Sequence, residues 1–124
     1  MSGSHDFEPK LVSAFSGIPV VEIACGEHHY CAIDSNGDLY TWGTPTAQYN
    51  KGQLGHGDLK SQEIPKRVES LEQYRVVKVS CGGYHTILLT SDGDLFGFGA
   101  GSYGEIGYGE SKDSSTPKKI EVFP

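Results

Sequence analysis

Short runs of β-branched and aromatic residues recur along the chain, separated by clusters of glycine, asparagine, aspartate and serine. Residues 20–24 (VVEIA) and 76–80 (VVKVS) are two such runs. After a glycine-containing bend they are followed by residues 29–34 (HYCAID) and 85–90 (HTILLT). None of these runs has the period of an amphipathic helix, whereas their length and composition are typical of strands. The pattern therefore predicts an all-β chain without helices.

Two tight turns join these strands to a third, aromatic strand. The Asn-Gly and Asp-Gly pairs at residues 35–38 and 91–94 favour two-residue hairpins, because both turn residues then need positive φ. The aromatic strands that follow are residues 39–43 (LYTWG) and 95–99 (LFGFG). By strand alternation, Tyr40 and Trp42 lie on one face of the first, and Phe96 and Phe98 on one face of the second. Fourth strands are expected around residues 65–70 and 117–123.

The four-strand pattern is an internal repeat. Residues 20–43 align with residues 76–99 at a shift of 56, with ten of 24 positions identical. The segments GQLGHG and GEIGYG then align at a shift of 52, so the first copy carries four extra residues within 44–51. The closing prolines are Pro65, Pro117 and, in a partial third unit, Pro9. The predicted division is an N-terminal tail or added residues (1–8), the end of a preceding repeat (9–19), a first full repeat (20–75) and a second (76–124).

The order C-G-x-x-H, S-[ND]-G-D-L-[YF], W-G, G-Q-L-G-H-G and a closing proline resembles the regulator of chromosome condensation repeat. The resemblance covers residues 9–124, with Phe98 in place of the tryptophan expected in the second copy. It implies propeller blades, which in that family form seven-bladed rings. Two blades cannot close such a ring, and each blade needs neighbours to bury its faces. We therefore expect two four-stranded antiparallel blades that form part of a propeller, or a propeller completed by oligomerisation.

Composition narrows the class of partner. The net charge is −6 and the ten Lys and Arg residues are scattered, which disfavours direct binding of nucleic acid. No apolar run approaches the roughly 18 residues of a membrane span, and residues 1–10 lack the pattern of a signal peptide. Three cysteines, an odd number, favour reduced thiols over a disulfide framework. These features predict a cytoplasmic or nuclear protein without membrane association.

Three motifs suggest ligand sites and are better explained by structure. Gly99, Gly101 and Gly104 spell a dinucleotide-binding G-x-G-x-x-G, but no helix or βαβ unit follows, and the first copy has no partner for Gly101. Because the C-x-x-x-H pairs Cys25/His29 and Cys81/His85 share one repeat phase, we expect them to lie too far apart to hold one zinc ion. Residues 34–38 (DSNGD) lack the glycine and glutamate spacing of a calcium loop. No cofactor, metal or catalytic site is predicted.

The residues that differ between the copies are the candidates for binding a partner, because the copies share what the fold requires. The first copy's longer polar loop, residues 44–51, carries a tyrosine, a residue favoured in binding surfaces. The predicted partner-binding residues are Gln48, Tyr49, Asn50, Lys51, His56 and Tyr108.

The resemblance implies a non-catalytic scaffold for protein–protein recognition. Members of the family also serve as guanine-nucleotide exchange factors for a small GTPase and as parts of large ubiquitin ligases. These roles are the alternatives. Because each chain supplies two blades, a homo-oligomer that completes a ring is a further expectation.

Overall fold

The computed structural model describes residues 17–43, 52–99 and 114–120. These residues form two four-stranded antiparallel sheets, as predicted, each a meander whose strands pair in chain order. The first sheet contains β1 (Val20–Cys25), β2 (Tyr30–Asp34), β3 (Leu39–Gly43) and β4 (Gln62–Arg67). The second contains β5 (Val76–Cys81), β6 (His85–Thr90), β7 (Leu95–Gly99) and β8 (Ser114–Ile120). We call these sheets the first and second blade.

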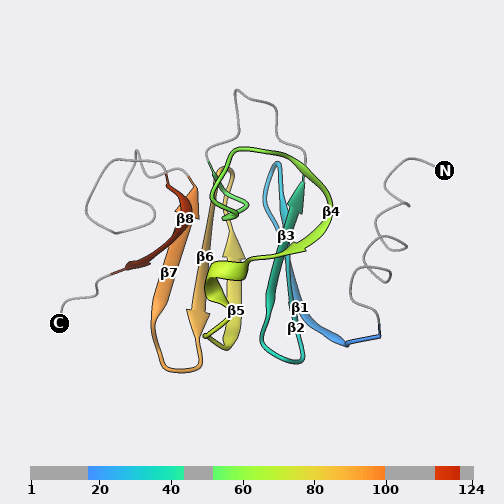
Figure 1. Ribbon diagram of the computed structural model, residues 1–124, viewed down its shortest axis with the longest axis vertical. Helices are drawn as coiled ribbons and strands as arrows, with labels where there is room; N and C mark the ends of the chain where they lie inside the picture. Colours follow the sequence, from blue (N-terminus) through green and yellow to red (C-terminus); the bar gives the residue numbers. More distant parts are fainter. Residues whose placement is uncertain (1–16, 44–51, 100–113, 121–124) are drawn as a thin grey trace.

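Both predicted hairpins form, but their turns are longer than the two residues expected. The Asp34 N–H donates to the Asp38 carbonyl and the Thr90 N–H to the Asp94 carbonyl, so three residues lie within each turn. The β2–β3 register pairs Ile33 with Leu39, and the β6–β7 register pairs Leu89 with Leu95, so the glycine-containing turns lie where the sequence places them. In Figure 1 both turns lie at the lower end of the blades.

The fourth strands differ from the prediction. β4 and β8 each begin three residues before their closing proline, at Gln62 and Ser114, so the prolines lie inside the strands rather than at their start. Each is an edge strand with one partner, where a proline need not supply a ladder N–H. After β4 the chain also forms a short 3-10 helix, η2 (Glu69–Leu71), that the sequence did not predict.

The main core lies between the blades. Cys31, Ile33 and Leu39 from one face of the first blade pack with the second blade and with the connection between the blades. The second blade contributes Val76, Val79, Leu88, Phe96 and Phe98, and the connection contributes Val68 and Leu71. The opposite face of the first blade carries a separate cluster of Ala32 and Trp42, packed with Val20 and Tyr40. The predicted alternation of the aromatic strands is thus confirmed. Phe96 and Phe98 face the first blade, whereas Tyr40 and Trp42, at the same repeat positions, belong to the face turned away from the second.

No helix in the described part of the chain is long and apolar enough to cross a membrane.

Candidate functional site

The C-G-x-x-H motif forms a tight bend in each blade. The backbone N–H of Gly26 donates to the His29 carbonyl at 2.8 Å, and that of Gly82 donates to the His85 carbonyl at 2.9 Å. In both bends the histidine ring lies against the glycine, where an added Cβ would collide with the ring carbon Cε1. The motif position therefore requires glycine, because any larger side chain would collide with the histidine ring.

His29 also joins the two blades. Its Nε2 lies 2.8 Å from Thr86 Oγ1 on β6, and the Thr86 hydroxyl donates to the Gln53 carbonyl at 2.9 Å. Since that hydroxyl proton is used, His29 Nε2 must carry a proton and donate it. The ring nitrogen Nδ1 is buried without a hydrogen-bond partner.

Equivalent positions of the two bends lie in direct contact. The rings of His28 and Tyr84 stack with centroids 5.7 Å apart and an interplanar angle of 13°. A Cβ on Gly26 would collide with the Gly82 carbonyl oxygen. These bends therefore lie close together, because β1 and β5 pack against each other there. Of the four residues in the two C-x-x-x-H pairs, His29 and Cys81 belong to one group of possible metal ligands, whereas Cys25 and His85 do not.

Two cysteines also meet between the blades. Cys31 Sγ on β2 lies 3.0 Å from Cys81 Sγ at the end of β5. With His29 they form the one group of three metal-ligating residue types found in the described ranges, all ligand atoms lying within 4.8 Å of one another. Two thiolates on one tetrahedral zinc ion lie about 3.8 Å apart, since each Zn–S bond is about 2.3 Å, and a structural site takes four ligands. The geometry favours direct contact between the sulfurs.

Sequence reasoning missed this cluster. The sequence pattern pairs the two motif cysteines, Cys25 and Cys81, each with the histidine of its own copy. Cys31 lies outside the repeated motif. A hydrogen bond from the Cys31 thiol lowers the pKa of Cys81, and His29 and Thr86 act in the same direction. Burial raises the pKa of Cys31. Cys81 is therefore the thiol of the pair that ionises more readily.

The glycine loop after residue 51 packs against the second blade. Gly52, Gly55 and Gly57 all have positive φ, which explains their spacing in the motif. Gly55 lies flat on the Phe98 ring, since a Cβ there would come within 2.7 Å of Cε2. The Gly57 N–H donates to the Ser115 carbonyl of β8 at 2.8 Å. In the first copy this loop therefore holds the next blade.

The glycines of the supposed dinucleotide motif are structural where they are described. Gly99 pairs with His85 and with Ser114 inside the second sheet, so it ends a strand and begins no helix. Gly101 and Gly104 lie outside the described residues.

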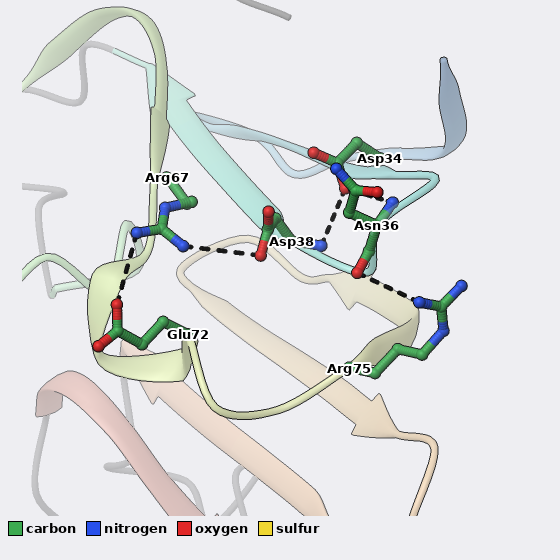
Figure 2. A network of polar contacts seen from close by, with 6 residues as sticks. All are labelled: Asp34, Asn36, Asp38, Arg67, Glu72 and Arg75. Atoms are coloured by element: carbon green, nitrogen blue, oxygen red, sulfur yellow. Dashed lines mark hydrogen bonds and ion pairs between the residues drawn. The ribbon is translucent and has the colours of Figure 1, made fainter. Parts of the chain in front are cut away.

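The calcium-like segment is a hairpin held by its own aspartate. Asp34 Oδ1 accepts hydrogen bonds from the backbone N–H groups of Asn36 and Asp38, at 2.9 and 3.0 Å (Figure 2). In the second blade Thr90 Oγ1 accepts from the Asp94 N–H at 3.2 Å in the same way. Asp34 is thus a turn residue.

Two arginines fix this hairpin to the connection between the blades. Arg75 donates to the carbonyls of Ser35 and Asn36 at 3.1 and 3.3 Å. Arg67 lies 3.7 Å from Asp38 Oδ1 and 3.6 Å from Glu72 Oε1, so it bridges the turn and the residue after η2 (Figure 2). The network positions the second blade relative to the first.

Of the predicted partner-binding residues, His56 is described, while Gln48, Tyr49, Asn50, Lys51 and Tyr108 lie outside the described residues. His56 is half-buried, and its Nε2 lies 2.8 Å from Thr41 Oγ1. Because the Thr41 hydroxyl donates to the Leu54 carbonyl, His56 Nε2 must donate in turn. Burial lowers the pKa of His56.

A pocket of about 100 Å³ opens beside His56. It is lined by Gly55, His56, Lys66, Arg67, Glu69, Ser70 and Thr116, and therefore by charges of both signs. Two large apolar side chains on the same segment are exposed to solvent: Leu59 at 60% and Ile64 at 54%. We call Leu59, Ile64 and this pocket the rim surface. Sequence reasoning missed both apolar residues, although the repeat comparison could have found them, since Ser111 and Thr116 occupy the equivalent positions of the second copy.

Two models of the regulator of chromosome condensation (RCC1) repeat match the sequence. One covers residues 36–89 and 92–124, and the other covers residues 20–48 and 76–105. Both place two repeats in the chain.

Individual relatives agree with this match. The chain is 36% identical over 119 residues to the ultraviolet-B receptor UVR8 of Arabidopsis thaliana, covering 96% of this chain and 26% of the receptor. It is 40% identical over 116 residues to the E3 ubiquitin-protein ligase HERC2 of Homo sapiens, covering 92% of this chain and 2% of the ligase. The chain thus spans about a quarter or less of these relatives.

A solved structure resembles the fold. The chain superimposes on yeast RCC1 (Prp20), crystallised bound to Kap60, with a TM-score of 0.73 and 21% identity. The superposition covers 86% of this chain and 25% of the yeast chain. The two sheets are therefore arranged like propeller blades of that protein.

Proposed function

The chain belongs to the regulator of chromosome condensation (RCC1) repeat family, and on that premise we propose that it is a protein–protein interaction module with no catalytic role of its own. The shared repeat positions described above hold blades together: Gly26, Gly82 and His29 act at the bends, and Gly55 in the glycine loop. The surface that differs between the copies is left for recognition.

The exposure of Leu59 and Ile64 carries this proposal. Apolar side chains exposed at 60% and 54% on one short segment are a common feature of protein-binding surfaces. The repeat does not require them, since serine and threonine take their places in the second copy. The pocket is lined in part by the same stretch of chain and adds Lys66, Arg67 and Glu69, which suit a partner segment that pairs apolar with charged side chains.

The test replaces both residues by those of the second copy. The Leu59→Ser/Ile64→Thr variant keeps side chains that the repeat already accommodates, so its unfolding midpoint is expected to stay near that of the unchanged chain. Partners captured from cell extract by the unchanged chain are expected to be lost with the variant and retained with Asp92→Ser, an exposed change on the second blade. Equal capture by all three proteins would contradict the proposal.

The alternative function is guanine-nucleotide exchange on a small GTPase. It is supported by the resemblance to yeast RCC1, which is a resemblance in fold. Release of a fluorescent GDP analogue from a small GTPase of the Ran type tests it. We expect no acceleration by the chain, and an acceleration would replace the scaffold proposal by the exchange-factor one.

A second alternative is that the chain is a propeller region of a larger ubiquitin ligase. Its support is the 40% identity to HERC2 over 92% of the chain. The recognition surface would then recruit a protein to the ligase, which leaves the scaffold role unchanged. The test is to express a ligase that contains this chain, with and without Leu59→Ser/Ile64→Thr, and to measure ubiquitination of the captured partner. Ubiquitination that depends on the two residues supports the ligase alternative over a scaffold alone.

We further propose that the chain works inside a larger ring, made either by more blades or by further copies. Phe96 and Phe98 of the second blade are covered by the first blade, and the equivalent face of the first carries Tyr40 and Trp42. A neighbouring blade on that face would repeat the observed packing. Mass measurement in solution separates a monomer from a closed ring of several copies. The free thiols of Cys25, Cys31 and Cys81 support a location in the cytoplasm or nucleus.

A further inference from the structure

The thiol pair Cys31 and Cys81 lies where the two blades meet. Their sulfurs are 3.0 Å apart, and the residues are 50 positions apart in sequence. Cys31 is fully buried and Cys81 is half-buried. Cys81 is therefore the more exposed residue of the pair.

The repeat does not require this pair. Cys81 is the motif cysteine and corresponds to Cys25, but Cys31 corresponds to Ile87 in the second copy. With isoleucine at position 31, the motif cysteine would contact an apolar side chain. The dithiol thus depends on Cys31, which the first blade carries and the second blade replaces by isoleucine.

The surroundings make the two cysteines chemically different. The hydrogen bond from Cys31 lowers the pKa of Cys81, whereas burial raises the pKa of Cys31. A half-buried thiolate beside a buried thiol is the arrangement of a reactive cysteine with a resolving cysteine. Cys25 is exposed, and burial of part of its surface raises its pKa, so it is the less nucleophilic thiol near neutral pH.

We propose that Cys31 and Cys81 are an oxidation site that forms a disulfide between the first and second blades. The oxidant class is a small peroxide. The Cys81 thiolate attacks one peroxide oxygen, the O–O bond breaks, and the leaving hydroxide takes up a proton to form water. The Cys31 sulfur then attacks the sulfenic acid on Cys81, the S–S bond forms, the S–O bond breaks, and the hydroxide leaves as water with the Cys31 proton. Two thiols and one hydrogen peroxide give one disulfide and two waters.

The bond would fix the blades to each other. Both sulfurs belong to strands of packed sheets, so closing the gap needs a movement of about 1 Å to reach a bond of about 2.05 Å. A link across 50 positions restricts the unfolded chain strongly. The unfolding midpoint is expected to rise by about 10 °C on oxidation and to return when a thiol reductant is added.

The experiment counts thiols in the whole chain before and after oxidation. Reduced protein is treated with hydrogen peroxide, free thiols are alkylated with N-ethylmaleimide, and intact mass and peptide mapping locate the bond. The unchanged chain is expected to go from three alkylated cysteines to one, with Cys31 joined to Cys81. Cys25→Ser is expected to form the same bond. Cys31→Ile, which places the second copy's own residue at this position, and Cys31→Ser, which preserves the size of the side chain, are both expected to form none.

Three results would overturn the proposal. Cys31 and Cys81 could stay free while the exposed Cys25 alone is oxidised. The bond could join Cys25 to Cys81 instead. The protein could carry stoichiometric zinc and resist oxidation until a chelator is added, which would make His29, Cys31 and Cys81 a metal site.

Discussion

His29 of the first blade donates a hydrogen bond from Nε2 to Thr86 Oγ1 of the second, at 2.8 Å. Both residues are buried, and the Thr86 hydroxyl donates a hydrogen bond to the Gln53 carbonyl of the glycine loop. One side chain of a repeated motif thus connects its own bend, the next blade and the loop that holds that blade. The contact gives the motif histidine of the first blade a role in holding the two blades together.

Breaking this contact should weaken the packing between the blades and destabilise the fold. We expect His29→Ala and Thr86→Val each to lower the free energy of unfolding by about 2 kcal/mol, because each leaves a buried polar partner unsatisfied. The double variant should show a coupling of about 1 kcal/mol. Urea unfolding of the four proteins measures this. His85→Ala is the matched control at the same repeat position, and strictly additive losses for His29 and Thr86 would contradict the contact.

The packing of Gly55 on Phe98 predicts a cost beyond that of backbone strain. Gly55→Ala should lower the free energy of unfolding by about 3 kcal/mol, since it combines a positive φ with a clash against a buried ring. Gly93→Ala, which has a similar φ and open space around the new Cβ, should cost only about 1 kcal/mol. Thermal unfolding compares the two, and equal losses would show that the loop does not rest on Phe98.

The Asp34 turn predicts a rescue by threonine. Asp34→Ala should lower the free energy of unfolding by about 2 kcal/mol, because the Asn36 and Asp38 N–H groups lose their acceptor. Asp34→Thr should recover at least half of that loss, since Thr90 performs this role in the second blade. Adding calcium should leave the unfolding midpoint unchanged. A large upward shift with calcium would restore the discarded calcium site.

His56 predicts a loss of stability in acid. Because burial lowers its pKa, the unfolded chain binds the proton first as the pH falls below about 6.5. The stabilising effect of the neutral ring is complete above that pH and declines below it. Unfolding midpoints between pH 7.5 and 5 should therefore fall less for His56→Gln, whose amide can still donate to Thr41, than for the unchanged chain. Parallel curves would show that His56 does not contribute.

The sequence predicted what each copy does by itself. Alternation along β3 and β7 placed the aromatic residues on the correct faces, and the Asn-Gly and Asp-Gly pairs located both hairpins. These features depend on local backbone geometry, which a short segment determines. The predicted starts of β4 and β8 were wrong, because a strand tolerates proline only where it lies at the edge of its sheet, and a short segment does not reveal that position.

Contacts between the copies could not be predicted in the same way. The stacking of His28 on Tyr84 and the meeting of Cys31 with Cys81 depend on how closely β1 and β2 approach β5. Alignment of the two copies does not indicate how far apart they lie in the folded chain. It does carry differences, and Leu59 against Ser111, Ile64 against Thr116 and Cys31 against Ile87 were available as signals from the start.

Photo-crosslinking from the rim surface tests the central claim most directly. A photoreactive amino acid is placed at Leu59 in one protein and at Asp92, in the β6–β7 turn of the second blade, in another. We expect a crosslinked partner protein from position 59 that disappears when Ile64→Thr is added, and none from position 92. Crosslinks from position 92 alone, or from position 59 with no effect of Ile64→Thr, would contradict recognition by this surface.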